Sequence, residues 1–230
     1  MRITLKHRFD FGVDSEVVGD DLRKPDAWDA LRTQTTGAFA LPGDRAEWER
    51  LADERPDLAE RARWIHAWLE QHGSGSLASY GVGVAALELW LVRIKPDVDL
   101  VATEYAGATV DRLARVFPEA RVLKHDLLHD APVAADVHLF HRVDTELDQS
   151  AWRAVFERFA DQRVLFLTQP ASGRQLFAEW RRNLVNRHGT DAGFVRNRAA
   201  LEALWSETHR ASATTVGDVV AWALEPRPRA

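Results

Sequence analysis

Short apolar runs alternate with amphipathic helical runs from residue 74 onward, and this alternation restricts the possible folds more than any other feature of the sequence. The strand-like runs are SLASYG, VDLVATEY, ARVLKHD, ADVHLF and RVLFLTQ, and runs of helical periodicity separate them. Short buried strands connected through helices are typical of parallel βαβ units, in which helices cover both faces of the sheet. The sequence therefore predicts an α/β protein.

The last two strand-like runs, within HRASATTVGDVVAWALEP, are separated only by Gly217 and Asp218. A two-residue link makes an antiparallel hairpin, whereas a parallel pair needs a crossover of about a dozen residues or more. We therefore expect a doubly wound, mostly parallel sheet that ends in a reversed strand.

The first part of the chain has a different pattern. Residues 2–11 alternate as in a strand, and residues 26–72 have helical periodicity that is interrupted at TTGAFALPGD. Because the periodicity changes at GSGS, we divide the chain into a mainly helical N-terminal cap, residues 1–73, and a ligand-binding domain, residues 74–230. The interruption suggests that the cap moves as a lid.

Composition excludes several classes of protein. Apolar residues make up 46% of the chain, and no apolar stretch approaches the roughly 20 residues of a membrane-spanning helix. There are no cysteines, so disulfides and thiol catalysis are excluded. The net charge of -5 argues against broad nucleic-acid binding. We expect a soluble, cytoplasmic protein with a small-molecule ligand.

Residues 75–86, GSLASYGVGVAA, form the first strand, turn and helix of the ligand-binding domain. Gly81 and Gly83 permit a sharp turn and let a ligand lie against bare main chain. Ala85 and Ala86 are small enough for the next helix to pack close to its strand. This arrangement is typical of nucleotide-binding α/β domains, although GxG also occurs in plain strand-to-helix turns.

Ligands of open parallel sheets lie beyond the carboxyl ends of the strands. In this chain those ends carry Ser79, Tyr80, Gly81, Gly83, Glu104, Tyr105, Asp126, Leu127, His141, Arg142, Asp144 and Glu146. Glu104 follows Gly81 by about 20 residues, where a carboxylate can accept hydrogen bonds from both hydroxyls of a ribose. Asp126 is placed to accept from an adenine amino group, and Tyr105 to lie along the adenine face.

The order of these features resembles the class I S-adenosylmethionine-dependent methyltransferases. The resemblance runs from SYGVGVA through ATEY, KHDLL and ADVHLFHRVD to TTVGDVVAWALEP, over residues 75–226. It implies a Rossmann-like, seven-stranded sheet in the order 3-2-1-4-5-7-6 with the seventh strand antiparallel. It also implies S-adenosylmethionine as the cofactor and methyl transfer by in-line displacement to a small organic acceptor, so that residues 74–230 would be the methyltransferase domain.

The resemblance also assigns residues to the cofactor. Gly81 and Gly83 would approach its methionine part, Glu104 would bind the ribose and Asp126 the adenine. The remaining residues of the expected cofactor site are Ser79, Tyr80, Tyr105 and Leu127.

Two departures from the family pattern leave alternatives open. Ser79 stands where the family has an acid, and Ala85 stands where it has a third glycine. A non-catalytic module that binds S-adenosylmethionine is therefore one alternative. Gly81, Gly83 and Ala86 also fit GxGxxA, so an NAD-dependent oxidoreductase is another. The terminal hairpin and Asp126 favour the methyltransferase.

Acceptors that must lose a proton need a base near the methyl group. We predict His141 for this role, because its ordinary pKa suits proton transfer near neutral pH, and we place Asp144, as a second catalytic residue, and Glu146 behind it. The segment HDLLHD has two histidines four residues apart, but it lies at a strand-to-loop transition, and we expect no metal site there.

Overall fold

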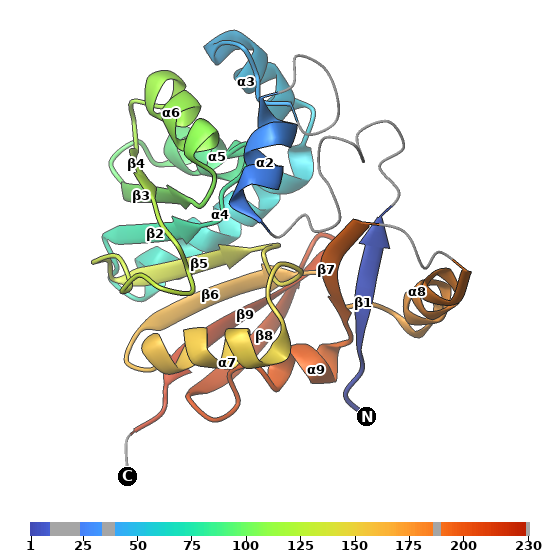
Figure 1. Ribbon diagram of the computed structural model, residues 1–230. Helices are drawn as coiled ribbons and strands as arrows, with labels where there is room; N and C mark the ends of the chain where they lie inside the picture. Colours follow the sequence, from blue (N-terminus) through green and yellow to red (C-terminus); the bar gives the residue numbers. More distant parts are fainter. Residues whose placement is uncertain (10–23, 34–39, 186–189, 229–230) are drawn as a thin grey trace.

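The computed structural model describes residues 1–9, 24–33, 40–185 and 190–228. Its elements in chain order are β1 (Thr4–Phe9), α2 (Pro25–Arg32), α3 (Arg45–Asp53), α4 (Pro56–Gln71), β2 (Ser76–Tyr80), α5 (Ala86–Ile94), β3 (Asp99–Glu104), α6 (Gly107–Val116), β4 (Arg121–Lys124), β5 (Val137–His141), α7 (Gln149–Arg158), β6 (Arg163–Thr168), α8 (Gly173–Val185), β7 (Thr190–Arg196), α9 (Arg198–Glu202), β8 (His209–Val216) and β9 (Val219–Pro226) (Figure 1).

The main sheet has seven strands in the order β4-β3-β2-β5-β6-β9-β8 (Figure 1). The strands from β4 to β6 are parallel, and β9 is antiparallel to both β6 and β8. Gly217 and Asp218 link β8 to β9, with Val216 paired to Val219. The predicted doubly wound sheet with a reversed strand is therefore confirmed.

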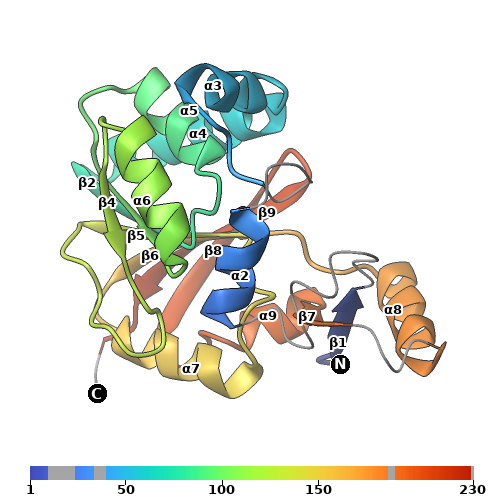
Figure 2. The same ribbon diagram turned by 45° about the horizontal axis from the view of Figure 1, so that its top comes forward.

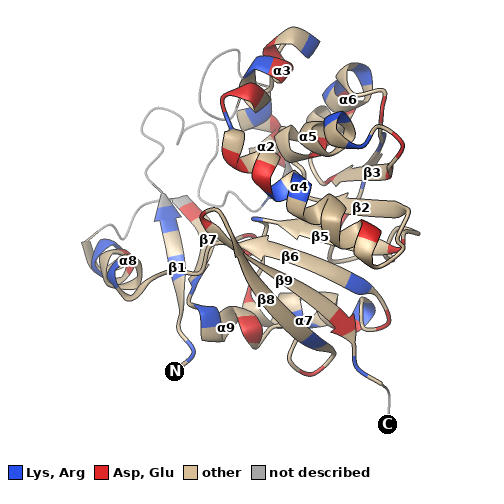
Figure 3. Cartoon of the chain, turned by 180° about the vertical axis from the view of Figure 1, so that it is seen from behind, with Lys and Arg blue, Asp and Glu red and all other residues tan. Residues whose placement is uncertain are grey.

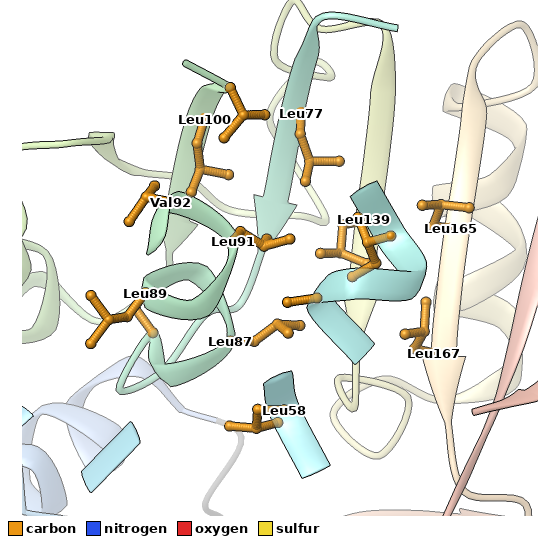
Figure 4. Close-up of a cluster of buried hydrophobic side chains, with 14 of the residues drawn as sticks. Leu58, Leu77, Leu87, Leu89, Leu91, Val92, Leu100, Leu139, Leu165 and Leu167 are labelled. Carbon is orange, nitrogen blue, oxygen red and sulfur yellow. The ribbon is translucent and has the colours of Figure 1, made fainter. Parts of the chain in front are cut away.

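Helices cover both faces of this sheet, which explains why its central strands are apolar throughout. On one face, a cluster of buried side chains joins β2, β3, β5 and β6 to α4 and α5, as Leu77, Leu87 and Leu139 show in Figure 4. On the other face, Phe140 packs with Trp152 and other side chains of α7. Because successive strand residues point to opposite faces, Leu139 and Phe140 belong to different layers.

The N-terminal helices contribute to the same core. Pro56 lies in the first turn of α4, where its missing N–H costs no hydrogen bond, and Ile65 and Leu69 are buried in the cluster that contains Leu77 of β2. Residues 40–73 therefore pack directly on the sheet and its helices. The boundary at residue 73 stays a prediction. The first half of the interruption TTGAFALPGD, residues 35–39, lies outside the described residues, and the prediction that the cap moves as a lid stays a prediction.

A second, two-stranded sheet pairs the N-terminal strand with a strand from late in the chain. The predicted strand near the N-terminus forms as β1 and runs antiparallel to β7, with Thr4 opposite Arg196. Strand β7 was not expected, because TDAGFVR is short, contains a glycine and has its only partner almost 190 residues away in sequence. This sheet and α8 lie to one side of the main sheet (Figure 2).

Charged side chains lie mainly on the helices and at strand ends, while the middle of the main sheet carries few of them (Figure 3). This distribution is expected for strands that are buried on both faces. None of the helices in the described ranges has the length and apolar character needed to cross a membrane.

Candidate active site

A cavity of about 470 Å³ opens at the carboxyl ends of β2, β3, β4 and β5. The predicted residues that line it are Tyr80, Gly81, Gly83, Glu104, Tyr105, Asp126 and Leu127. Helix α2 contributes Trp28 and Arg32 from the N-terminal region. The cavity is therefore where the strand-end rule places a ligand, and an element from outside the predicted binding domain helps to enclose it.

The glycine turn after β2 has the conformation that its sequence suggests. Gly81 and Gly83 have φ values of +64° and +56°, in the left-handed region. A Cβ added at Gly81 would lie 2.7 Å from Cγ1 of Val143, and one at Gly83 would lie 2.9 Å from a guanidinium nitrogen of Arg32. Ala85 is also left-handed, with φ of +51°, although it is not glycine. The turn thus keeps its shape where the third glycine is missing, at a cost of about 1 kcal/mol.

The Glu104 carboxylate joins the ends of β2 and β3. It accepts a 2.7 Å hydrogen bond from the Gly83 amide and a 2.8 Å bond from the Tyr105 amide. These bonds fix its orientation beside the glycine turn. Oε1 also accepts a 3.3 Å bond from the Ala106 amide, so of the about four acceptor positions of a carboxylate one, on Oε2, remains free for a hydroxyl group.

Asp126 and His125 line the other end of the cavity. Asp126 accepts hydrogen bonds from the Leu128 amide and from His129, at 2.8 and 2.7 Å. Partial burial raises the pKa of Asp126, but these bonds outweigh it and leave the pKa below its usual value. Nε2 of His125 bonds the Ala131 carbonyl, and its Nδ1 is buried without a partner among the described residues. Both side chains therefore offer acceptor atoms.

Ser79 does not line the cavity. It is buried, and its hydroxyl donates a 2.6 Å hydrogen bond to the carboxyl group of Glu88 in the first turn of α5. Burial raises the pKa of Glu88 to about 7. An acid is thus present near the end of β2, but it lies behind the glycine turn and supports Ser79.

His141 and Asp144, predicted as catalytic, also do not line the cavity. Nε2 of His141 accepts a 2.8 Å bond from the buried Arg61 of α4, and burial together with this guanidinium lowers the His141 pKa to about 3. His141 lies two residues after Leu139, on the face of β5 that α4 and α5 cover. Asp144 is buried and accepts a hydrogen bond from the Thr168 hydroxyl. Both residues face structural partners.

Glu146 and Asp148 are the acids that the loop after β5 presents to the cavity, and the Asp148 carboxylate caps helix α7. The indole N–H of Trp28 donates a hydrogen bond to Glu146. Burial raises the pKa of Glu146 to about 7, opposed by that hydrogen bond and by the positive charge of Arg32. The Arg32 guanidinium lies 5.1 Å from the centre of the Trp28 ring and interacts electrostatically with both Glu104 and Glu146.

Strand β7 holds the loop that carries Glu146. The buried Arg196 donates hydrogen bonds to the carbonyls of Asp144 and Leu147. Gly193 has φ of +99°, and a Cβ there would lie 1.9 Å from the Thr145 carbonyl oxygen, so only glycine fits at this approach. The small sheet thereby fixes the loop from behind. The sequence named Glu146 only as a candidate behind His141, and Arg196 was not named, because its role depends on contacts between distant segments.

A glycine turn, a carboxylate after the second parallel strand and a cavity at the strand ends are the features that α/β folds use to hold nucleotide-type cofactors. No protein-family model matches the sequence, and no curated protein matches it either.

Solved structures do share the fold. PigF, solved with SAH, superposes with a TM-score of 0.62 at 13% identity over 95% of this chain and 63% of that one. Human N-acetylserotonin methyltransferase in complex with SAM gives 0.61 at 12% identity, over 89% of this chain and 57% of that one. The mitomycin 7-O-methyltransferase MmcR gives 0.57 at 17% identity, over 94% of this chain and 76% of that one.

At these identities the similarity establishes the fold alone. The chain spans less than two thirds of the length of PigF and of the human enzyme. The fold is that of the class I S-adenosylmethionine-dependent methyltransferases, as the sequence predicted.

Proposed function

We propose that this protein is an S-adenosylmethionine-dependent methyltransferase that acts on a small organic acceptor. The observation that carries the proposal is that one cavity of about 470 Å³ contains both the expected cofactor residues and Glu146, a carboxyl group suited to proton transfer. A cavity of this size suits small molecules. The net charge of -5 also favours a small acceptor over a nucleic acid.

The residues present fit the cofactor. S-adenosylmethionine supplies an electrophilic methyl group on a sulfonium. The main chain at Gly81 and Gly83 would hold its methionine part, and Oε2 of Glu104 has an acceptor position free for a ribose hydroxyl. Asp126 would accept from the adenine amino group. Arg32, which lies against Gly83, would pair with the carboxylate of the methionine part.

Glu146 takes the role that the sequence suggested for His141. With a pKa of about 7, its carboxyl group is about half ionised at neutral pH and can accept the proton of an acceptor hydroxyl. Trp28 fixes its orientation through the indole N–H. The rest of the task is to position the acceptor and exclude water, which the cavity walls do.

The cofactor assignment is tested by calorimetric titration with S-adenosylmethionine, S-adenosylhomocysteine and NAD. We expect micromolar binding of the first two, weakened at least about tenfold in Glu104→Ala, because a ribose hydroxyl loses a charged acceptor. Glu157→Ala, which removes an exposed acid of α7, is the matched control. Binding of NAD alone would indicate an oxidoreductase, and binding of none of the three would contradict the proposal.

The catalytic assignment is tested with Glu146→Gln. We expect kcat to fall about 10²- to 10⁴-fold with an unchanged cofactor Kd, because the amide cannot accept the proton. In the unsubstituted protein, kcat should rise with pH through about 7 as Glu146 ionises. Glu88→Gln is the control, since Glu88 has a similarly raised pKa but lies outside the cavity. If Glu146→Gln bound the cofactor and kept full activity, this residue would have no part in the mechanism. If the unsubstituted protein bound S-adenosylmethionine but turned over no acceptor, the non-catalytic module would be favoured.

A further inference from the structure

The Arg142 side chain lines the cavity, and its charge acts on the buried Asp144 carboxyl and on His141 only through space. The residue is exposed, and its side chain makes no hydrogen bond or ion pair within the described ranges. The acids that line the same cavity differ in this respect, since Glu104, Asp126 and Asp148 all accept hydrogen bonds from protein groups. A positive charge that faces a cavity and is left unpaired is available to an anionic ligand.

The backbone of Arg142 is held in an unfavourable conformation. Its φ is +56°, which costs a residue other than glycine about 1 to 2 kcal/mol. The Arg142 amide donates a 2.8 Å bond to the Leu167 carbonyl, and the next residue, Val143, packs against Gly81. These contacts fix where the side chain begins. Among the described residues, no hydrogen bond or ion pair of the guanidinium compensates for the strain, and strain of this kind is concentrated at functional sites.

Arg142 and Glu146 lie on one short loop and line the same cavity. The Glu146 amide donates a 3.2 Å bond to the Val143 carbonyl, which closes a tight turn between them. A molecule whose hydroxyl group reaches Glu146 therefore has Arg142 within the length of a small ligand.

We propose that Arg142 forms an anion-binding subsite that holds a carboxylate of the methyl acceptor. The inference rests on the proposed function and narrows it. The acceptor class is a small hydroxy acid, in which one end carries the hydroxyl group that faces Glu146 and the other carries the carboxylate that pairs with Arg142. The guanidinium can make two parallel hydrogen bonds to a carboxylate, which fixes orientation as well as affinity.

The cofactor also carries a carboxylate, so the two sources must be separated. Arg32 lies against Gly83, at the turn expected to hold the methionine part, and so it is the nearer partner for the cofactor. Arg142 shares its loop with Glu146, which faces the acceptor. This placement assigns the Arg142 subsite to the acceptor.

The experiment compares pairs of probes that differ only in charge: the three monohydroxybenzoates and the corresponding hydroxybenzamides. Release of S-adenosylhomocysteine gives kcat/KM for each, and calorimetry gives the Kd of S-adenosylmethionine. We expect the acids to be preferred about 10- to 100-fold, and Arg142→Gln to abolish that preference with a cofactor Kd within about twofold. Arg142→Lys should keep part of it. Arg153→Gln removes an exposed charge of α7 outside the cavity and should behave as the unsubstituted protein.

Two results would overturn the assignment. One is an equal kcat/KM for the acids and the amides, or no turnover of any acid, in a protein that binds S-adenosylmethionine. If the neutral amides were methylated in that case, the proposed function would still hold. The other is a large rise in the cofactor Kd of Arg142→Gln with an unchanged acid preference, which would assign the subsite to the cofactor. Failure of the proposed function can be distinguished from failure of the Arg142 assignment, because in the first case the unsubstituted protein would not bind S-adenosylmethionine.

Discussion

Replacing Glu88 with glutamine should stabilise this protein at alkaline pH and not at acid pH. Glu88 is buried beneath the glycine turn, and its carboxyl group accepts a hydrogen bond from Ser79. No cationic group opposes the burial, so the pKa rises from 4.5 to about 7, with the negative charge of Glu104 adding to the effect. The folded protein therefore disfavours ionisation of this group.

The magnitude follows from the difference between the folded and unfolded pKa. At about 1.4 kcal/mol for each tenfold change in ionisation constant, the shift of Glu88 corresponds to about 3 kcal/mol. A raised folded pKa gives stability that is fully present below the unfolded pKa of 4.5 and is lost as pH rises through about 7. Glutamine cannot ionise. The difference in unfolding free energy between Glu88→Gln and the unsubstituted protein should thus increase by about 3 kcal/mol between about pH 4.5 and pH 8.

The assay is urea denaturation of both proteins at the two pH values. Glutamine has one more N–H than a protonated carboxyl group, and an unsatisfied donor costs about 1 kcal/mol at every pH. That cost displaces the whole curve and leaves its change with pH intact. Glu157→Gln, at an exposed site, should show no such change. If the advantage of Glu88→Gln were the same at both pH values, the carboxyl group would have an ordinary pKa and the reasoning from burial would be refuted.

Three further predictions concern stability around the site. Gly81→Ala should lower the free energy of unfolding, measured by urea denaturation, by about 2 to 4 kcal/mol, since the new Cβ would lie 2.7 Å from Val143 and φ is +64°. The control is Gly73→Ala, where φ is +62° but no atom lies within 4 Å, so that only the backbone conformation contributes to the loss. Equal losses in the two variants would refute the clash with Val143. Arg61→Ala should lower Tm by several degrees, because it leaves buried His141 without its donor; an unchanged Tm would contradict this. His141→Ala should lower Tm while kcat stays within about threefold, and a large fall in kcat would restore the catalytic role suggested by the sequence.

Most of the fold could be predicted because the signals are local. The change from helical to strand periodicity near residue 74 and the two-residue link at Gly217 and Asp218 depend only on neighbours in sequence, and together they specify the parallel sheet and its reversed strand. Strand β7 could not be predicted on this basis. Its stabilising partner is β1, and its approach to Thr145 through Gly193 becomes visible only when the chain is folded.

Residues of the site were predictable where backbone position alone decides the role. Gly81, Gly83 and Glu104 follow strands directly, so the sheet brings them to the cavity whatever else the chain does. The choice of His141 depended on residue type, and the period of two along β5 directs it away from the cavity, toward Arg61.

The chemistry of Glu146 is a property of the assembled fold. In sequence it is an ordinary glutamate of a loop, and only the folded chain brings Trp28 and Arg32 of α2 to it while burying its carboxyl group. Burial by itself would keep the acid protonated at neutral pH, whereas the indole N–H and the guanidinium favour the ionised form. The balance leaves the pKa at about 7, so the same group can accept a proton and release it. Helix α2 therefore contributes to the proposed active site as much as the strands do, although nothing in its own sequence says so.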